Sequence, residues 1–332
     1  IMIDIKRNRY LHPIAEEWLS NVKKFFNTTR RPYIIQGAKR KYFNSYASKL
    51  RYECLSEIFN NTNDKKQRKV YVTLLYYWWK HIDNIILGSP DYLETLVTRW
   101  DNKKNGSIIL QKILKDILTS YYDKISGEYG LDLVNKLNIK TCPYCNRQFI
   151  YTFKGQSYER PELDHFYSKA AYPLLCLSFY NLIPSCHSCN HVKLEEKLGL
   201  SPYSRAFNTK FAITDKSGER LTKSKIFRLT ENEIKLDFYA CDAKEDVNIR
   251  VLGLKEVYNK HTDYVKELVD KSMAYDAHAR NVLVESFQSV GYHPRQVYDF
   301  VWGRYLMEAK YEDRPLSKLT KDILDLLDIS RG

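Results

Sequence analysis

The 332-residue sequence has few linker-forming residues and no long apolar segment. Its 12 glycines and 10 prolines are too few for long flexible linkers. Residues 1–10 lack the apolar core of a signal peptide. The longest apolar stretch, residues 70–79, is too short to cross a bilayer. These absences predict a cytoplasmic protein that has no membrane partner.

Two further absences narrow the class of protein. No glycine-rich phosphate-binding loop is present, which predicts no nucleotide site on this chain. Seven cysteines without an export signal argue against a disulfide framework. Three of them, Cys54, Cys176 and Cys241, stand alone, and we expect them to be small buried thiols. The sequence is 44% hydrophobic and 14% aromatic, which excludes a disordered chain.

Positive charge is concentrated in the N-terminal part. The net charge is +13, and residues 1–140 hold 25 basic against 14 acidic side chains. Basic runs occur at residues 39–41 and 65–69. Concentrated positive charge attracts polyanions, so the sequence favours a nucleic-acid partner. The alternatives are solvated helix faces and an acidic protein partner.

Apolar spacing predicts a mostly helical α+β protein with three regions. A basic helical region covers residues 1–138, a cysteine-rich unit covers 139–202, and short strands followed by helices cover 203–332. We expect the aromatic cluster at residues 76–79 to be core rather than a base-stacking surface. The expected helices are 13–25, 40–60, 65–87, 90–102, 107–126, 257–273, 294–310 and 316–327, and the expected strands are 157–163, 211–214, 226–230 and 234–238.

Four cysteines form two C-x-x-C pairs, Cys142 with Cys145 and Cys186 with Cys189. Each pair offers two thiolates on one tight turn, and two such turns complete a tetrahedral four-sulfur site. This donor set suits Zn²⁺ and leaves no open position, so the predicted zinc is structural. A redox role would require one pair in a thioredoxin-like setting rather than two pairs.

Polar residues between and beside the cysteine pairs indicate a catalytic site. Asp164-His165 follows the expected strand, and Asn190, after the last cysteine, is expected to open a helix. Carboxylate and amide oxygens from Asp164 and Asn190 would suit Mg²⁺ or Mn²⁺. Neutral His165 could then act as a general base on water. The alternatives are a turn cap for Asp164, a surface histidine for His165 and a helix N-cap for Asn190.

The motifs C-P-Y-C, L-D-H, Y-N-L-I-P-S-C and C-N-x-x-K, in this order over about 55 residues, resemble the zinc-knuckle form of the HNH, or ββα-metal, nuclease family. The resemblance implies that His165 is the general base and that Asn181 holds its ring. It implies that Asp164 and Asn190 bind the catalytic metal, with His187 or His191 as alternatives to Asn190. Cys142, Cys145, Cys186 and Cys189 would bind the structural zinc.

The reaction implied by this resemblance is phosphodiester hydrolysis, with DNA as the expected substrate. Arg147, Lys169 and Lys193 are candidate phosphate contacts, and solvated surface lysines or arginines are the alternative. RNA, perhaps tRNA, could be cut by the same site, and a non-catalytic nucleic-acid-binding or adaptor module is a further alternative. The sequence also resembles HNH components of Septu-type and retron-linked anti-phage systems, which implies an ABC/SMC-like ATPase partner.

Overall fold

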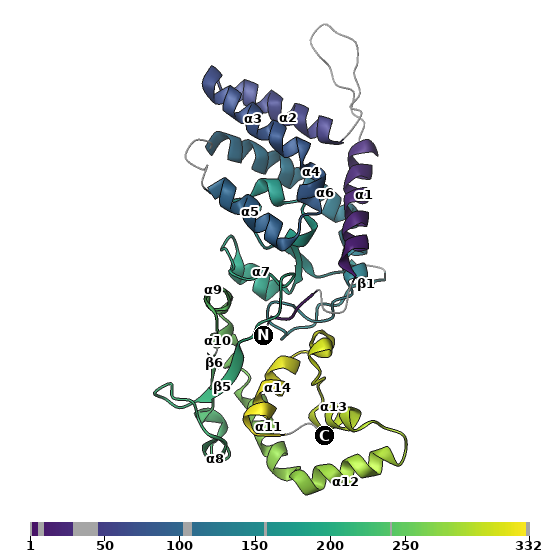
Figure 1. Cartoon of the computed structure of the whole chain (residues 1–332), viewed down its shortest axis with the longest axis vertical. Coiled ribbons are helices and arrows are strands. Elements are labelled where there is room, and N and C mark those ends of the chain that lie inside the picture. Colours follow the sequence, from purple (N-terminus) through teal and green to yellow (C-terminus); the bar gives the residue numbers. More distant parts are fainter. Residues whose placement is uncertain are drawn as a thin grey trace.

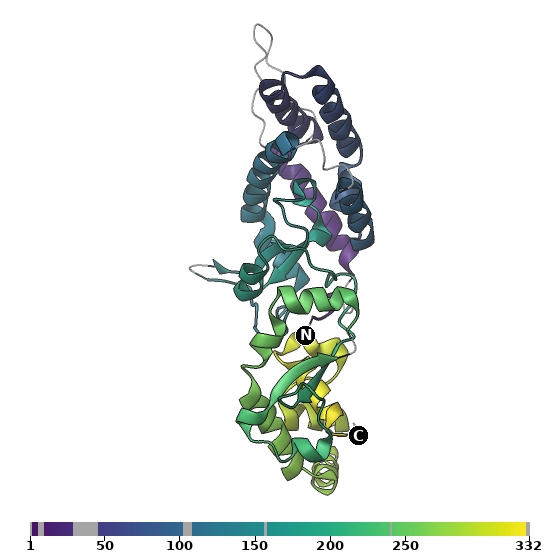
Figure 2. The ribbon, with the colours of Figure 1, turned by 90° about the vertical axis from the view of Figure 1, so that its left-hand side faces the viewer.

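The computed structural model describes residues 2–5, 10–28, 46–101, 108–155, 158–239 and 241–329. Within these ranges the protein is mostly helical, with three two-stranded antiparallel sheets, which confirms the predicted α+β class. The N-terminal helices lie at one end of an elongated molecule and the C-terminal helices at the other (Figures 1 and 2). The basic run at residues 39–41 lies outside the described residues.

Six helices lie among the described residues of the N-terminal part. The predicted helix over residues 65–87 breaks at His81, where the backbone leaves helical geometry, and the one expected at 107–126 continues to Leu137. Trp18, Val22 and Phe25 lie at helical spacing and are buried, as their pattern predicts. The helices are α1 (Leu11–Thr28), α2 (Tyr46–Asn61), α3 (Lys65–Lys80), α4 (Ile82–Ile86), α5 (Pro90–Asp101) and α6 (Ile108–Leu137).

The aromatic cluster of α3 differs from the predicted core. Tyr76 and Tyr77 are 58% and 47% exposed, so the core interpretation is wrong for these two residues. Arg99 on α5 donates a hydrogen bond to the Tyr77 hydroxyl at 3.3 Å. The exposed lysines Lys65 and Lys69 lie on the same helix. This helix therefore presents both positive charge and aromatic rings to solvent.

The central unit contains a β–β–α arrangement. Strand β3 (Glu162–His165) pairs antiparallel with β4 (Leu182–Ser185), and α7 (His187–Lys193) follows directly. The strand predicted over residues 157–163 is instead divided by Pro161, which lacks a backbone N–H, into β2 (Tyr158–Glu159) and β3. Helix α7 begins inside the second cysteine pair, so Asn190 lies within the helix and not at its start. The remaining elements are β1 (Phe153–Lys154), η2 (Pro173–Leu175) and η3 (Phe179–Asn181).

The C-terminal part contains two of the predicted strands, 211–214 and 234–238, which pair antiparallel with each other. The strand predicted at 226–230 is wrong, because residues 223–226 form helix α8 and a turn follows. The helix predicted at 294–310 ends at Gly303, whose φ of +64° suits glycine at a helix C-terminus. The elements are β5 (Lys210–Thr214), α8 (Lys223–Ile226), η4 (Glu231–Glu233), β6 (Lys235–Tyr239), α9 (Ala243–Val251), α10 (Leu254–Tyr258), α11 (Thr262–Ala274), α12 (Ala277–Gln288), α13 (Pro294–Trp302), η5 (Glu308–Asp313) and α14 (Ser317–Leu326).

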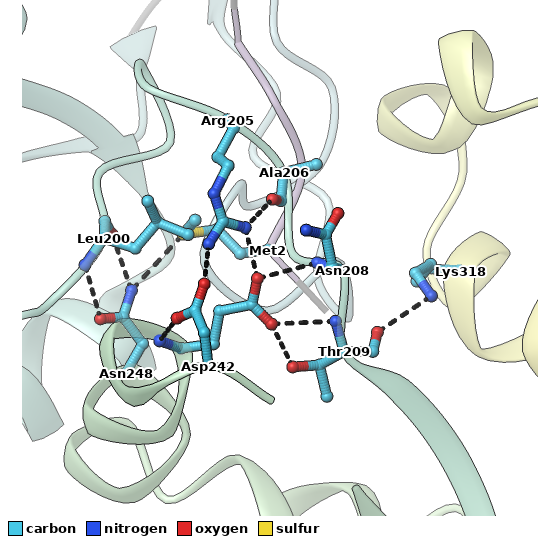
Figure 3. A network of polar contacts seen from close by, with 10 residues as sticks. Met2, Leu200, Arg205, Ala206, Asn208, Thr209, Asp242, Asn248 and Lys318 are labelled. Carbon is cyan, nitrogen blue, oxygen red and sulfur yellow. Dashed lines mark hydrogen bonds and ion pairs between the residues drawn. The ribbon is translucent and has the colours of Figure 1, made fainter. Parts of the chain in front are cut away.

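A buried carboxylate fixes the chain just after the central unit (Figure 3). The Glu245 side chain on α9 accepts hydrogen bonds from the backbone N–H groups of Asn208 and Thr209, both at 2.9 Å. It also pairs with Arg205. Burial acts to raise the pKa of Glu245, but hydrogen bonds from Arg205, Thr209 and the two backbone amides outweigh it and lower the pKa. The ionised carboxylate thereby fixes the chain where it leaves the central unit.

Replacing Glu245 with Gln is expected to destabilise the protein by about 1–3 kcal/mol, because donors that now meet a carboxylate would lose charge-assisted bonds. Since folding lowers the pKa of Glu245, its contribution is complete above the unfolded pKa and is lost as the pH falls from there through the lower folded pKa. Urea unfolding from neutral pH down through the pKa of Glu245 checks the loss of stability in Glu245→Gln and its dependence on pH. Glu256→Gln, at an exposed position on α10, is the control, and an equal loss there would contradict the prediction.

Candidate metal centre and catalytic site

The four paired cysteines meet in one buried cluster. The ligand atoms of Cys142, Cys145, Cys186 and Cys189 all lie within 4.8 Å of one another, and Cys145 Sγ is 4.0 Å from Cys186 Sγ. A zinc ion with Zn–S bonds of about 2.3 Å requires sulfur atoms roughly 3.8 Å apart. The predicted cluster is therefore confirmed, and its geometry suits a metal such as zinc.

The buried sulfurs lie close enough together to affect one another's pKa values. Burial is the largest cause that raises the pKa of Cys142, whereas hydrogen bonds from Cys142, Cys186 and Cys189 lower the pKa of Cys145 well below its usual range. A bound cation would favour the thiolate form of all four sulfurs, because metal ligation requires deprotonated sulfur.

The first cysteine pair connects distant parts of the chain. The Tyr258 hydroxyl on α10 donates to the Cys145 carbonyl, and Ile3 N–H donates to the Pro143 carbonyl at 2.9 Å. Asn146 has a positive φ of +47°, and its side-chain Nδ2 donates to the Tyr311 carbonyl at 2.7 Å. The cysteine cluster therefore stabilises contacts to the N-terminal segment and to the C-terminal helices.

Asp164 lies in a buried polar network beside this cluster. The Tyr144 hydroxyl donates to Asp164 Oδ2 at 2.6 Å, and Lys193 Nζ lies 3.2 Å from Asp164 Oδ1. Lys193 also donates to the His165 carbonyl at 2.7 Å. Burial is the main influence on the pKa of Asp164 and raises it, although Lys193 and Tyr144 act in the opposite direction. Both carboxylate oxygens are engaged by protein donors.

The three predicted phosphate contacts differ in placement. Lys193 has 0% of its side chain exposed, which does not fit a phosphate contact because such a contact needs an accessible ammonium. Arg147 donates from Nε to His261 Nε2 at 3.0 Å, so it packs against the C-terminal helices. Lys169 is partly exposed and lies 3.3 Å from Asp123, and its phosphate contact stays a prediction.

His165 is buried at the end of β3 with one ring nitrogen fixed. Its Nε2 lies 3.0 Å from the Cys176 carbonyl, and its ring meets the edge of Tyr122 on α6 at 4.4 Å. A carbonyl can only accept, so Nε2 carries the proton and Nδ1 keeps its lone pair. Burial, the largest cause, lowers the pKa of His165 to about 3. The imidazole is therefore neutral at neutral pH.

Asn181 does not hold the His165 ring in the way that the resemblance implies. Its Oδ1 accepts from Tyr167 N–H at 2.7 Å, and its Nδ2 donates to the carbonyls of Tyr167 and Leu175 at 3.1 and 3.0 Å. Among the described contacts, the ring partner is the Cys176 carbonyl instead. Asn181 fixes the loop that carries this carbonyl and so acts on His165 indirectly. Nothing in the sequence marks a carbonyl as the ring partner.

Asp164 and His165 lie on opposite sides of β3. Asp164 contacts Lys193 on α7, whereas His165 contacts Tyr122 on α6. This arrangement follows from the alternation of side chains along a strand. A group bound at the strand end could therefore be approached by the histidine from one side and by the α7 side from the other.

Asn190 pairs with a carboxylate that sequence reasoning missed. Its Nδ2 donates to Glu162 Oε2 at 2.6 Å, and His187 Nδ1 lies 2.8 Å from Glu162 Oε1. The His187 and His191 rings stack with centroids 5.7 Å apart. Glu162 precedes Asp164 by two residues and so shares its strand face, a signal that the sequence offered. No described contact joins Asn190 to Asp164, the pair expected to share a metal.

Burial of His165 predicts acid sensitivity. The unfolded chain takes up a proton near the ordinary histidine pKa of about 6.5, whereas the folded chain does so only near pH 3. Above the unfolded pKa the ring is neutral in both states, so its protonation does not lower the free energy of unfolding there. Between about pH 6.5 and pH 5 the wild type should lose roughly 2 kcal/mol more stability than His165→Gln. Urea unfolding of both proteins checks this, and parallel pH profiles would contradict it.

Comparisons of this chain with protein-family models, curated proteins and solved structures find no match. Among the described helices, none is both long and apolar enough to cross a membrane.

Proposed function

We propose that this chain is an HNH-type endonuclease that hydrolyses phosphodiester bonds of DNA with the help of a divalent cation. One observation carries the proposal: a β–β–α unit beside a four-cysteine cluster places a neutral histidine, with one tautomer fixed, at the end of a strand. A purely structural zinc module would not need a buried histidine whose Nδ1 is kept unprotonated.

In the proposed reaction, His165 Nδ1 accepts a proton from the attacking water while Nε2 remains bound to the Cys176 carbonyl. A phosphate next to the ring would favour the imidazolium and raise the low pKa of the free chain. Asn181 keeps the carbonyl in place through the Leu175 backbone. Hydrolysis is in line, so the leaving oxygen departs on the side away from His165, towards the α7 face of β3.

A divalent cation would stabilise charge on the phosphoryl group and the leaving oxygen. Mg²⁺ or Mn²⁺ at Asp164 and Asn190 is the expectation from the resemblance. Asp164 does not fit this role well, because Tyr144 and Lys193 occupy its oxygens and the Lys193 ammonium would repel the ion. No step is therefore assigned to Asp164.

A nucleic-acid substrate is favoured by the positive charge of residues 1–140 and by the exposed lysines and tyrosines of α3, and the choice of DNA follows from the resemblance. Such a surface fits phosphate contacts that do not depend on base sequence. An RNA endonuclease that uses the same site is the second candidate. On the resemblance alone, we propose further that the nuclease is an effector of anti-phage defence with an ATPase partner. The adaptor or binding module is the non-enzymatic alternative.

A cleavage assay tests the proposal. The zinc-loaded wild type is incubated with supercoiled plasmid or with total tRNA, in Mn²⁺ or Mg²⁺ and, in parallel, with EDTA. We expect metal-dependent nicking or linearisation of the plasmid that EDTA abolishes. Cleavage confined to tRNA would favour the second candidate. If the chain binds nucleic acid but cleaves neither polymer, with or without the partner ATPase, this result would favour the binding or adaptor module.

A further inference from the structure

A row of exposed aromatic side chains follows the first cysteine pair. Phe149, Tyr151 and Phe153 occupy alternate positions of an extended segment and are 45%, 54% and 53% exposed. Ile150, between the first two, is buried, so the segment turns one side to the core and its aromatic side to solvent. The row ends in the β1–β2 hairpin, which extends outward from the side of the molecule (Figure 2).

Two rings of the row already form a stack. The centroids of the Phe149 and Tyr151 rings are 4.7 Å apart, and the ring planes are inclined by 17°. Within the part of the chain that the structure describes, neither ring stacks on a third one. Each ring therefore keeps an outer face on which a flat aromatic group can continue the stack.

We infer that Phe149, Tyr151 and Phe153 form a stacking platform for the bases of single-stranded nucleic acid. Exposed aromatic side chains bind unpaired bases because every base has a flat face that stacks on such a ring. The bases of a duplex are stacked on one another, so a duplex does not offer these faces. The inference rests on the proposed function for cleavage of the bound strand but not for its binding.

Charge favours a polyanion as the occupant of the row. Residues 147–160 hold three basic side chains and one acidic side chain, in a chain whose net charge is +13. Lys154, directly after Phe153, is exposed and offers its ammonium to the phosphates of a strand that stacks on the row. Tyr158, 57% exposed, lies directly opposite Lys154 across the hairpin, so aromatic surface and positive charge adjoin there as well.

The row begins next to the helix of the central β–β–α unit. Gln148, the residue before Phe149, donates from Nε2 to Ser188 Oγ on α7 at 3.3 Å. In the proposed reaction, the leaving oxygen departs towards this α7 side of β3. A strand that stacks on the row is thereby placed on the α7 side of the proposed catalytic unit.

Fluorescence anisotropy with labelled oligothymidylate tests the inference, with the zinc-loaded full chain and no added divalent cation. We expect Tyr151→Ala and Phe153→Ala each to weaken binding at least about fivefold, the loss of roughly one stacked base. Tyr151→Phe keeps the ring and should leave the Kd within about twofold of the wild type. The matched control Phe300→Ala, 70% exposed on α13, should do the same.

Two further probes of equal length separate stacking from phosphate contacts. One is a strand without bases and the other is a blunt duplex. Neither offers free base faces, so we expect the two alanine variants to bind each of them within about twofold of the wild type. The slope of log Kd against log salt concentration should also stay unchanged in these variants, because no phosphate contact is lost.

Four results would overturn the inference. They are equal wild-type affinity for strands with and without bases, unchanged Kd values in both alanine variants, equal weakening in Phe300→Ala, and equal weakening for the duplex. Unchanged Kd values would leave the row to a protein partner. All four variants change exposed side chains, and zinc content and circular dichroism should match the wild type.

The binding assay needs no cleavage, so it distinguishes this inference from the proposed nuclease. Binding that follows the expected pattern in a chain that cuts no polymer in Mn²⁺ would support the stacking platform and count against the nuclease. Cleavage by a chain whose alanine variants bind like the wild type would do the opposite.

Discussion

Loss of the metal from the four cysteines is expected to unfold the centre of the chain. Zinc bound to four thiolates in small domains stabilises them by about 10–16 kcal/mol, which is as large as the whole stability of a typical protein. Here the first cysteine pair also bonds the N-terminal segment at Ile3 and the C-terminal part at Tyr258. We therefore expect Cys186→Ser to lower zinc content sharply and to abolish the cooperative thermal transition.

The control for this prediction is Cys241→Ser, because Cys241 lies outside the cluster and is exposed, so its expected burial is wrong. It should keep one zinc per chain and the unfolding temperature of the wild type. Zinc content by atomic absorption and thermal unfolding by circular dichroism check both variants. A Cys186→Ser protein that unfolds with the same transition as the wild type would contradict a structural role for the metal.

Lys193→Met is expected to destabilise the zinc-loaded protein by about 3–5 kcal/mol. The Lys193 ammonium is buried and is the cation paired with Asp164, so its removal leaves a buried carboxylate without a countercharge. The His165 carbonyl also loses a donor at 2.7 Å. Burial already raises the pKa of Asp164, and loss of Lys193 should raise it further. Acidification that protonates Asp164 should therefore recover part of the loss.

Two variants test whether this destabilisation comes from breaking the buried ion pair or from the loss of any lysine. Lys197→Met removes a lysine with an exposed side chain from the same segment and should change the unfolding free energy by less than about 0.5 kcal/mol. The double variant Lys193→Met with Asp164→Asn should regain stability relative to Lys193→Met, because it removes both charges. Urea unfolding at neutral pH measures all of these. A double variant that is less stable than Lys193→Met would contradict the account of the pair.

Local patterns in the sequence predict most of the helices and the metal cluster. Apolar residues at helical spacing, such as Trp18, Val22 and Phe25, identify α1 because a helix buries one stripe of its surface. The paired cysteines identify the cluster because ligand spacing is a local property. By contrast, α12 has no buried residue, so burial of an apolar stripe does not account for this helix.

The contacts inside the site could not be predicted in the same way. The partner of His165 is a backbone carbonyl, which every residue carries, and its identity depends on how the loop after β3 folds back. The burial of Lys193 depends on where α7 starts, and the helix begins three residues earlier than the sequence indicates. Glu162 was within reach of sequence reasoning, since it shares a strand face with Asp164, but its partners on α7 depend on the same helix register.

The most direct test of the account compares zinc-loaded wild type with zinc-loaded His165→Ala on supercoiled plasmid in Mn²⁺, under single-turnover conditions. Loss of a general base should slow cleavage by about 10²- to 10⁴-fold. Zinc content should be unchanged, and His278→Ala, at an exposed position on α12, should cleave like the wild type. Equal rates for wild type and a folded His165→Ala would contradict the assignment of the chemistry to His165.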